Sequence, residues 1–175
     1  FHNGATVTAE DVVYSIERCA DTSEGTPLVP AFSVIQEVKA VDERTVTITI
    51  AQRDLEFISY LTSAIIPKGY DDQATHPVGT GPFKFVEWTP AQHVILEANE
   101  EYWDGAPQMK KLTFNFISDT NTALVALETG EADLAFGTSL SATTFQQAQQ
   151  NENLATDSTV GNSFYFVNFN SNRIS

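Results

Sequence analysis

The sequence predicts an α+β fold with a mixed, largely antiparallel sheet and flanking helices. Residues 45–50 and 83–88 alternate apolar and polar side chains with the period of a strand, and each has a second candidate strand beside it across a short turn. Apolar residues at helical spacing occur in single segments around these pairs, for example over 9–20. Hairpins separated by single helices favour α+β packing over a regular series of βαβ units.

The first predicted element is an amphipathic helix over 9–20. Thr8 is a candidate N-cap with Asp11 three residues later, a spacing typical of the start of a helix. Apolar residues then recur at helical spacing up to Cys19, the single cysteine. One cysteine cannot form an intramolecular disulfide, and its place on a helix indicates a small buried residue.

A hairpin and a second, shorter helix are predicted next. Segments 33–41 and 45–50 flank the polar turn 42–44, and the second segment alternates strictly. Apolar residues at 55, 58 and 61 then predict a short helix near 54–63.

The stretch Gly79-Thr80-Gly81-Pro82 predicts a sharp turn that opens directly into a strand. Glycine permits backbone angles that other residues disfavour, and Pro82 fixes its own φ and biases Gly81 toward an extended conformation. Phe83 and Phe85 then alternate with their neighbours, so we expect a strand that pairs with 93–98 as a second hairpin.

The second half of the chain alternates predicted strands and helices. Residues 111–117 read as a strand, after which Ser118 or Asp119 can cap a helix that runs to Thr129 and ends at Gly130, a typical C′ glycine. Further predicted elements are a strand at 132–136, a helix at 141–151 and strands near 154–158 and 163–168.

Composition excludes several classes of protein. The 175 residues are 42% hydrophobic, too apolar for a disordered chain, yet no uncharged run approaches the ~20 residues of a membrane span. Nine basic and 23 acidic residues give a formal net charge of −14. Such a charge repels phosphate, so we expect no nucleic-acid partner, and the chain itself predicts no direct membrane insertion.

Motifs of enzymes and metal sites are not recognisable. A dinucleotide fingerprint would need a third glycine where Lys84 stands, and a helix instead of the predicted strand. His2, His76 and His93 lie far apart in sequence without paired spacing, and the many carboxylates single out no pair. We therefore predict no catalytic residue, no metal site and no cofactor.

Tyr102 and Trp103 admit two interpretations. They can cover the core, or they can form a platform on which a ligand stacks. Because large aromatic side chains mostly bury area, packing is the favoured interpretation.

Four motifs occur in order along the chain: Phe1-His2-Asn3-Gly4 with Thr8-Ala9-Glu10-Asp11-Val12-Val13-Tyr14-Ser15; Pro77-Val78-Gly79-Thr80-Gly81-Pro82-Phe83-Lys84 to Trp88; Asn99-Glu100-Glu101-Tyr102-Trp103-Asp104-Gly105; and Ala126-Leu127-Glu128-Thr129-Gly130-Glu131-Ala132-Asp133. Together they resemble the extracellular solute-binding proteins of family 5, the peptide, dipeptide and nickel receptors of bacterial ABC importers. Each motif alone is weak, whereas four in order over nearly the whole chain are specific.

The resemblance implies part of one lobe of a two-lobe, class II periplasmic-binding-protein-like fold. Family members are considerably longer, so we expect an internal fragment whose second lobe is absent. Residues 1–75 would form a small α+β subdomain of the first lobe, and residues 76–175 would supply the remaining strands and helices that lead back toward the hinge.

The resemblance further implies a substrate-binding component of an ABC importer. Such a protein captures peptides or another small solute and delivers it to a membrane permease, which implies an extracytoplasmic location, in the periplasm or as a cell-surface lipoprotein. An alternative is a non-transport sensor or chaperone-like interaction module on the same scaffold. Without the second lobe, the chain alone is expected to bind solutes weakly or not at all.

Two segments are predicted to reach the ligand, because loops that leave strand ends can line the cleft between two lobes. Gly137 permits close backbone approach, and the hydroxyl groups beside it can pair with polar ligand groups. For 162–170, which resembles the family strand that returns toward the hinge, the alternative is a core strand with one aromatic face. The candidate ligand-binding residues are Phe136, Gly137, Thr138, Ser139, Ser163, Phe164, Phe166 and Asn168.

Overall fold

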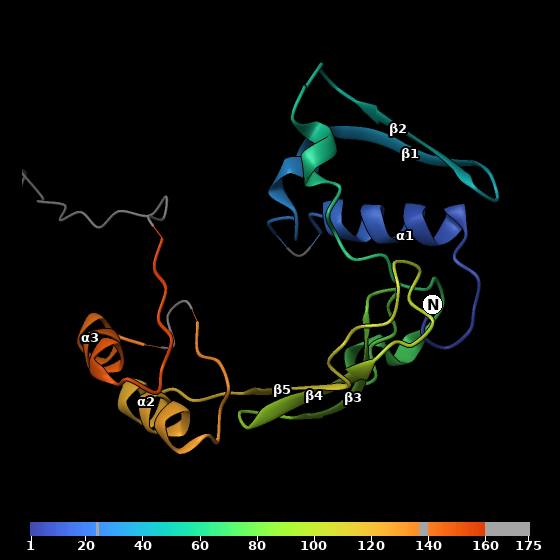
Figure 1. Ribbon diagram of the computed structural model, residues 1–175. Coiled ribbons are helices and arrows are strands. Elements are labelled where there is room, and N and C mark those ends of the chain that lie inside the picture. Colours follow the sequence, from blue (N-terminus) through green and yellow to red (C-terminus); the bar gives the residue numbers. More distant parts are fainter. Residues whose placement is uncertain (24, 137–139, 160–175) are drawn as a thin grey trace, which may run out of the picture. The chain divides into compact units, whose positions relative to one another are not determined.

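The computed structural model describes residues 1–23, 25–136 and 140–159, and the chain divides into two compact units, Phe1–Phe116 and Ile117–Ser175 (Figure 1). The first unit contains one helix and two antiparallel sheets, and the described part of the second contains two helices. The predicted subdomain boundary near residue 75 stays a prediction about the complete lobe.

The first unit begins with a helix that packs on a hairpin. Helix α1 (Ala9–Ala20) lies across one face of the antiparallel pair β1 (Ile35–Asp42) and β2 (Thr45–Ile50), as Figure 1 shows. Alternate residues of β2 are partly buried, which confirms the predicted two-residue period. Ile16, Phe32 and Phe57 form the buried centre between these elements, and Cys19 packs at its margin.

Three short 3-10 helices connect these elements, Pro30–Val34, Phe57–Tyr60 and Asp71–Ala74. The helix predicted near 54–63 is therefore only a four-residue 3-10 turn. The apolar spacing does not mark the buried face, because Leu55 and Ile58 are exposed. Phe57 inserts into the core beside Phe32, with ring centroids 6.2 Å apart, and Tyr60 packs at its margin.

The second sheet consists of β3 (Phe83–Thr89), β4 (His93–Ala98) and β5 (Lys111–Asn115) in the order β3-β4-β5. Both pairings are antiparallel, so the hairpin predicted around 83–98 is confirmed. A register shift between Phe85 and Glu87 inserts one extra residue in β3.

The register gives this sheet one apolar face, because residues directly opposite each other point to the same side. One row contains Phe85, Leu96 and Leu112, and the next contains Trp88, Val94 and Phe114. The opposite face carries mainly polar residues, such as the row Lys84, Glu97 and Lys111.

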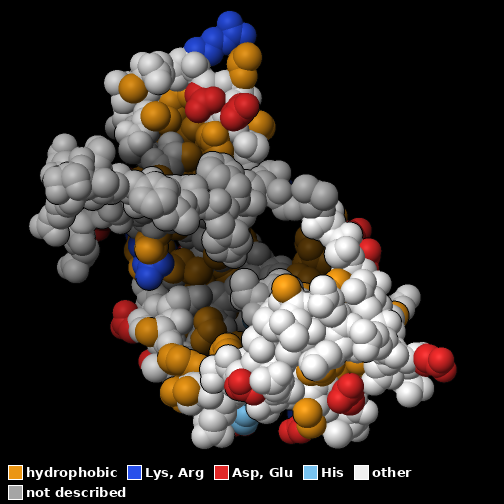
Figure 2. Space-filling view, turned by 90° about the vertical axis from the view of Figure 1, so that its left-hand side faces the viewer, with side chains coloured by type: hydrophobic (Ala, Val, Ile, Leu, Met, Phe, Trp, Pro, Cys, Tyr) orange, Lys and Arg blue, Asp and Glu red, His pale blue; other side chains and the backbone are white. Residues whose placement is uncertain are grey.

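The two ends of that apolar face differ in exposure. Phe83, Phe85 and Leu96 lie against the segment around Ile65 and Val78, with which they line a hollow. At the other end Trp88 is 51% exposed, Phe114 43% and Phe116 50%. Figure 2 shows hydrophobic side chains at the surface, between polar and charged ones, on the face of the molecule that is turned to the viewer. One half of the apolar face is therefore uncovered within the first unit.

In the second unit α2 (Thr120–Thr129) packs against α3 (Ala142–Gln150). Asp119 caps α2 by accepting a hydrogen bond from the Thr122 N–H at 2.8 Å, and Gly130 ends it in the left-handed region with φ 75°. Both ends of this helix agree with the sequence prediction.

Two predicted strands of the second unit are wrong. Residues 132–136 and 154–158 take irregular conformations, and neither segment pairs with a strand among the described residues. The Ala132 N–H instead donates to the Ala126 carbonyl at 2.9 Å, which ties the chain back to α2. The strand predicted at 163–168 lies outside the described residues.

Candidate functional site

The glycine-proline turn, residues 79–82, is held in place by His2, which lies near the start of the chain. The His2 N–H donates to the Gly79 carbonyl at 2.9 Å, and His2 Nε2 lies 2.9 Å from the Gly81 carbonyl. The Gly79 N–H points to Nδ1 of the same ring at 3.4 Å. The two ring contacts fit a tautomer that donates from Nε2 and accepts at Nδ1. His2 is thereby used as a structural clamp on the turn.

Asn99 fixes the other side of the turn. Its side chain is buried, and Nδ2 donates to the Gly81 carbonyl at 3.2 Å while the Asn99 N–H donates to the Pro82 carbonyl at 2.8 Å. Its Oδ1 accepts the Glu101 N–H at 3.2 Å and so orders the loop that follows β4. Three of the four sequence motifs therefore meet at this one turn.

Gln73 supports the entry to the turn. Its amide exchanges two hydrogen bonds with the backbone of Val78, from Nε2 to the carbonyl at 2.9 Å and from the N–H to Oε1 at 3.0 Å. The ring of His76 stands edge-on to Phe85, with centroids 6.0 Å apart. The polar groups around the turn thus bind each other.

Helix α1 is joined to the segment after residue 64 through Asp11 and Ser15. The Asp11 carboxylate accepts the Lys68 N–H and both the N–H and the hydroxyl of Thr8, each at 2.8 Å. The Ile66 N–H donates to Ser15 Oγ at 2.9 Å. Burial by itself would raise the pKa of Asp11, but the hydrogen bonds from Lys68 and Thr8 outweigh it and hold that pKa below its ordinary value. Thr8 and Asp11 thus form the predicted helix cap, and Asp11 is also the anchor that ties α1 to the backbone of Lys68.

A hollow of about 300 Å³ lies beside the turn. Most of its lining is apolar and includes Ile65, Ile66, Phe83 and Leu96. Because the nearby His2 and Gln73 side chains already bind backbone groups, this hollow can take a small apolar group and offers no pair of groups for acid-base chemistry.

The described residues show no arrangement typical of a metal or catalytic centre. No group of three metal-ligating side chains occurs within 1–23, 25–136 and 140–159. His93 approaches Glu87 at 3.3 Å; the Thr89 hydroxyl and His93 together lower the pKa of that carboxyl group. None of the helices in this part of the chain is long and apolar enough to cross a bilayer.

Of the predicted ligand-binding residues, only Phe136 belongs to the part that the structure describes. Phe136 is 67% exposed, and Leu134, two residues before it, is exposed as well. Gly137, Thr138, Ser139, Ser163, Phe164, Phe166 and Asn168 lie outside the described residues.

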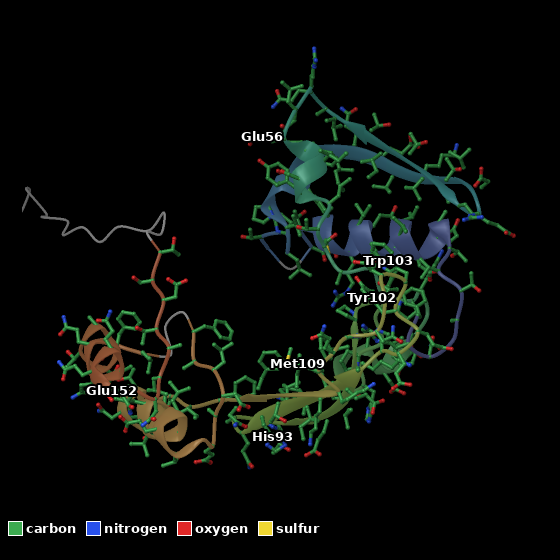
Figure 3. All side chains as sticks on the ribbon, viewed as in Figure 1. Glu56, His93, Tyr102, Trp103, Met109 and Glu152 are labelled. Carbon is green, nitrogen blue, oxygen red and sulfur yellow. The ribbon has the colours of Figure 1, made fainter. Side chains whose placement is uncertain are left out.

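The packing predicted for Tyr102 and Trp103 is wrong for the tryptophan. Trp103 is 83% exposed, whereas Tyr102 is half-buried, and their ring centroids lie 5.6 Å apart. Figure 3 shows both on the loop between β4 and β5. The tendency of large aromatic residues to be buried does not indicate whether a covering surface lies beside this particular loop.

Comparison with known proteins identifies the family. The model of the bacterial extracellular solute-binding proteins, family 5 Middle, matches residues 1–174. The chain belongs to this family. The predicted α+β fold class is also confirmed, because solved structures of class II periplasmic-binding-protein-like members match this chain.

Three similar proteins illustrate the range of the family. The glutathione-binding protein GsiB of Pectobacterium atrosepticum is 30% identical over 145 residues, which cover 78% of this chain and 28% of the relative. The oligopeptide-binding protein AppA of Bacillus subtilis is 26% identical, covering 97% of this chain and 33% of the relative. NikZ of Campylobacter jejuni, solved with Ni(L-His), has a TM-score of 0.76 at 25% identity and covers 87% and 32% of the two chains.

The chain spans about a third of the length of the curated relatives it matches.

Proposed function

We propose that this chain is part of the substrate-binding component of an ABC importer, which captures peptides or another small solute and delivers it to a membrane permease. The observation that carries the proposal is the match of residues 1–174 to family 5. Relatives whose names specify glutathione and oligopeptides support a peptide-like solute. The function is binding without turnover, at an extracytoplasmic site in the periplasm or on a cell-surface lipoprotein.

The ligand-contacting residues in this proposal are Phe136, Gly137, Thr138, Ser139, Ser163, Phe164, Phe166 and Asn168. The exposure of Phe136 supports its part, because an exposed aromatic ring can stack on an apolar ligand group. Gly137 leaves room for a ligand beside the backbone, and Thr138 and Ser139 supply hydroxyl groups.

Thermal unfolding of the whole protein with peptide pools tests the proposal. A ligand that binds only the folded state raises Tm, because it adds to the free energy of unfolding. The addition is about 2.7 kcal/mol at a ligand concentration one hundred times Kd. We expect a rise with short peptides, and a smaller rise in the variants Phe136→Ala and Asn168→Ala. Leu55→Ala, a comparably exposed residue elsewhere, is the control and should leave the rise unchanged.

Two results would contradict parts of this proposal. If no peptide, glutathione or metal chelate raised Tm, and a protein partner did, the chain would be an interaction module on the same scaffold. If ligands raised Tm equally in Phe136→Ala, Asn168→Ala and the control, the function would stand and the assignment of those residues would fail.

A further inference from the structure

Trp103 is the most exposed large hydrophobic side chain among the described residues, at 83%. Its ring contacts the half-buried ring of Tyr102 (Figure 3). Keeping a tryptophan in water forgoes the burial of one of the largest apolar side chains. Such a residue is enriched where proteins bind partners.

The loop that carries Trp103 is ordered by its own hydrogen bonds. The Tyr102 N–H donates to the carbonyl of buried Asn99 at 3.2 Å, and the Gly105 N–H donates to the Tyr102 carbonyl at 3.0 Å. Gly105 takes φ 93°, which favours glycine, and Lys110 pairs with Glu100 at 3.1 Å across the base of the loop. Trp103 is therefore presented on a fixed backbone, so a partner pays little to order it.

Two acidic residues lie close to Trp103 in the sequence of this loop. Glu101 and Asp104 are exposed, and neither forms an ion pair with any residue in the described ranges. The face of an indole ring attracts cations, and nearby carboxylates add to that attraction. The chain's formal net charge of −14 favours approach of basic partners and repels anionic membranes and nucleic acids.

We propose that Trp103, Glu101 and Asp104 form a docking surface for a basic polypeptide segment. An arginine side chain of the partner stacks on the indole ring of Trp103, and its guanidinium group pairs with the flanking carboxylates. This inference does not depend on the loop residues proposed above to contact the solute.

Tryptophan fluorescence of the 175-residue chain tests the surface directly. The chain has two tryptophans, so Trp88→Phe leaves Trp103 as the single emitter. The probe is a short peptide with two arginines, and its control is the same peptide with neutral citrulline at both positions. We expect saturable quenching by the arginine peptide, binding about five-fold weaker or worse with citrulline, and weaker arginine binding at high salt.

Charge variants separate a specific surface from a general effect of net charge. Glu101→Gln with Asp104→Asn should weaken arginine-peptide binding several-fold, whereas Glu37→Gln with Glu43→Gln, the same charge change on the β1-β2 hairpin, should leave it nearly unchanged. By NMR titration, Trp103→Ala should weaken binding about two- to five-fold.

Three outcomes overturn the proposal. The first is equal binding of the arginine and citrulline peptides. The second is protection of Trp103 from acrylamide quenching, which would mean that another part of the protein covers it. The third is sedimentation that shows self-association lost in Trp103→Ala, which would assign the surface to a second copy of the chain.

Discussion

The two sheets of the first unit differ in how completely their apolar faces are covered. The β1-β2 hairpin is closed by α1 and two 3-10 helices, so that Phe32 at its centre is only 1% exposed. The β3-β4-β5 sheet also has an apolar face, but the end with Trp88, Phe114 and Phe116 stays exposed. The first module completes its own core, whereas the second has apolar area left over for another surface.

Truncation of the closed core should have the largest effect. Phe32→Ala removes a fully buried ring that contacts Phe57, and we expect a loss of about 4 kcal/mol in the free energy of unfolding. Phe116→Ala, at the open end of the sheet, should cost about 1 kcal/mol because half of its surface is already in water. Urea unfolding of both variants measures the difference, and equal losses would contradict the comparison.

The anchor of α1 should come next and should depend on pH. Asp11→Asn replaces a carboxylate that accepts three hydrogen bonds, so we expect a loss of about 2 to 3 kcal/mol at pH 7. The pKa of Asp11 is lowered in the folded state; its charge therefore stabilises the fold above the unfolded pKa of about 3.9 and ceases to do so as pH falls through the folded pKa.

Unfolding curves at pH 7 and at pH 3 or below measure this dependence. The difference in free energy of unfolding between the native chain and Asp11→Asn should be smaller at the acidic pH. Other carboxyl groups with lowered pKa, such as Asp119, titrate in both proteins and cancel in the difference. A gap that stayed constant over this range would mean that the charge of Asp11 contributes nothing.

Removal of the Asn99 side chain, which supports the glycine-proline turn, should lower the free energy of unfolding by a similar or smaller amount. Asn99→Ala leaves the Gly81 carbonyl without one of its two side-chain donors and the Glu101 N–H without its acceptor, at a cost of about 2 kcal/mol. Asn115→Ala, an exposed residue of β5, is the control and should change stability by less than about 0.5 kcal/mol. Amide exchange at Glu101 should accelerate only in the first variant.

The sequence predicted what is local. Capping by Thr8 and Asp11, the two hairpins and the glycine end of α2 each depend on residues within a few positions of one another. Contacts between distant segments were not predictable from such patterns. His2 reaches Gly81 across 79 positions and Asp11 reaches Lys68 across 57, and nothing in the spacing of either residue indicates its partner.

The wrong predictions share a physical cause. Residues 132–136 are apolar enough for a strand, but no strand among the described residues pairs with them. Trp103 is large enough for a core residue, but it is 83% exposed on the loop that follows β4. Apolar composition measures what burial would gain, and only the tertiary fold decides whether a covering surface is present.

A substitution at the exposed end of the β3-β4-β5 sheet should change stability least and the exposed apolar surface most. Phe114→Thr places a β-branched residue, which favours strands, in β5 and removes a ring that is 43% exposed, so the free energy of unfolding should fall by less than about 1 kcal/mol. Binding of the dye ANS should drop, because the row of Trp88, Val94 and Phe114 loses a member of its exposed apolar patch. Leu55→Thr, which removes an exposed apolar side chain outside that row, should change dye binding less. A loss of several kcal/mol in Phe114→Thr, with unchanged dye fluorescence, would mean that this end of the sheet is covered as fully as the hairpin, and the contrast between the two sheets would fail.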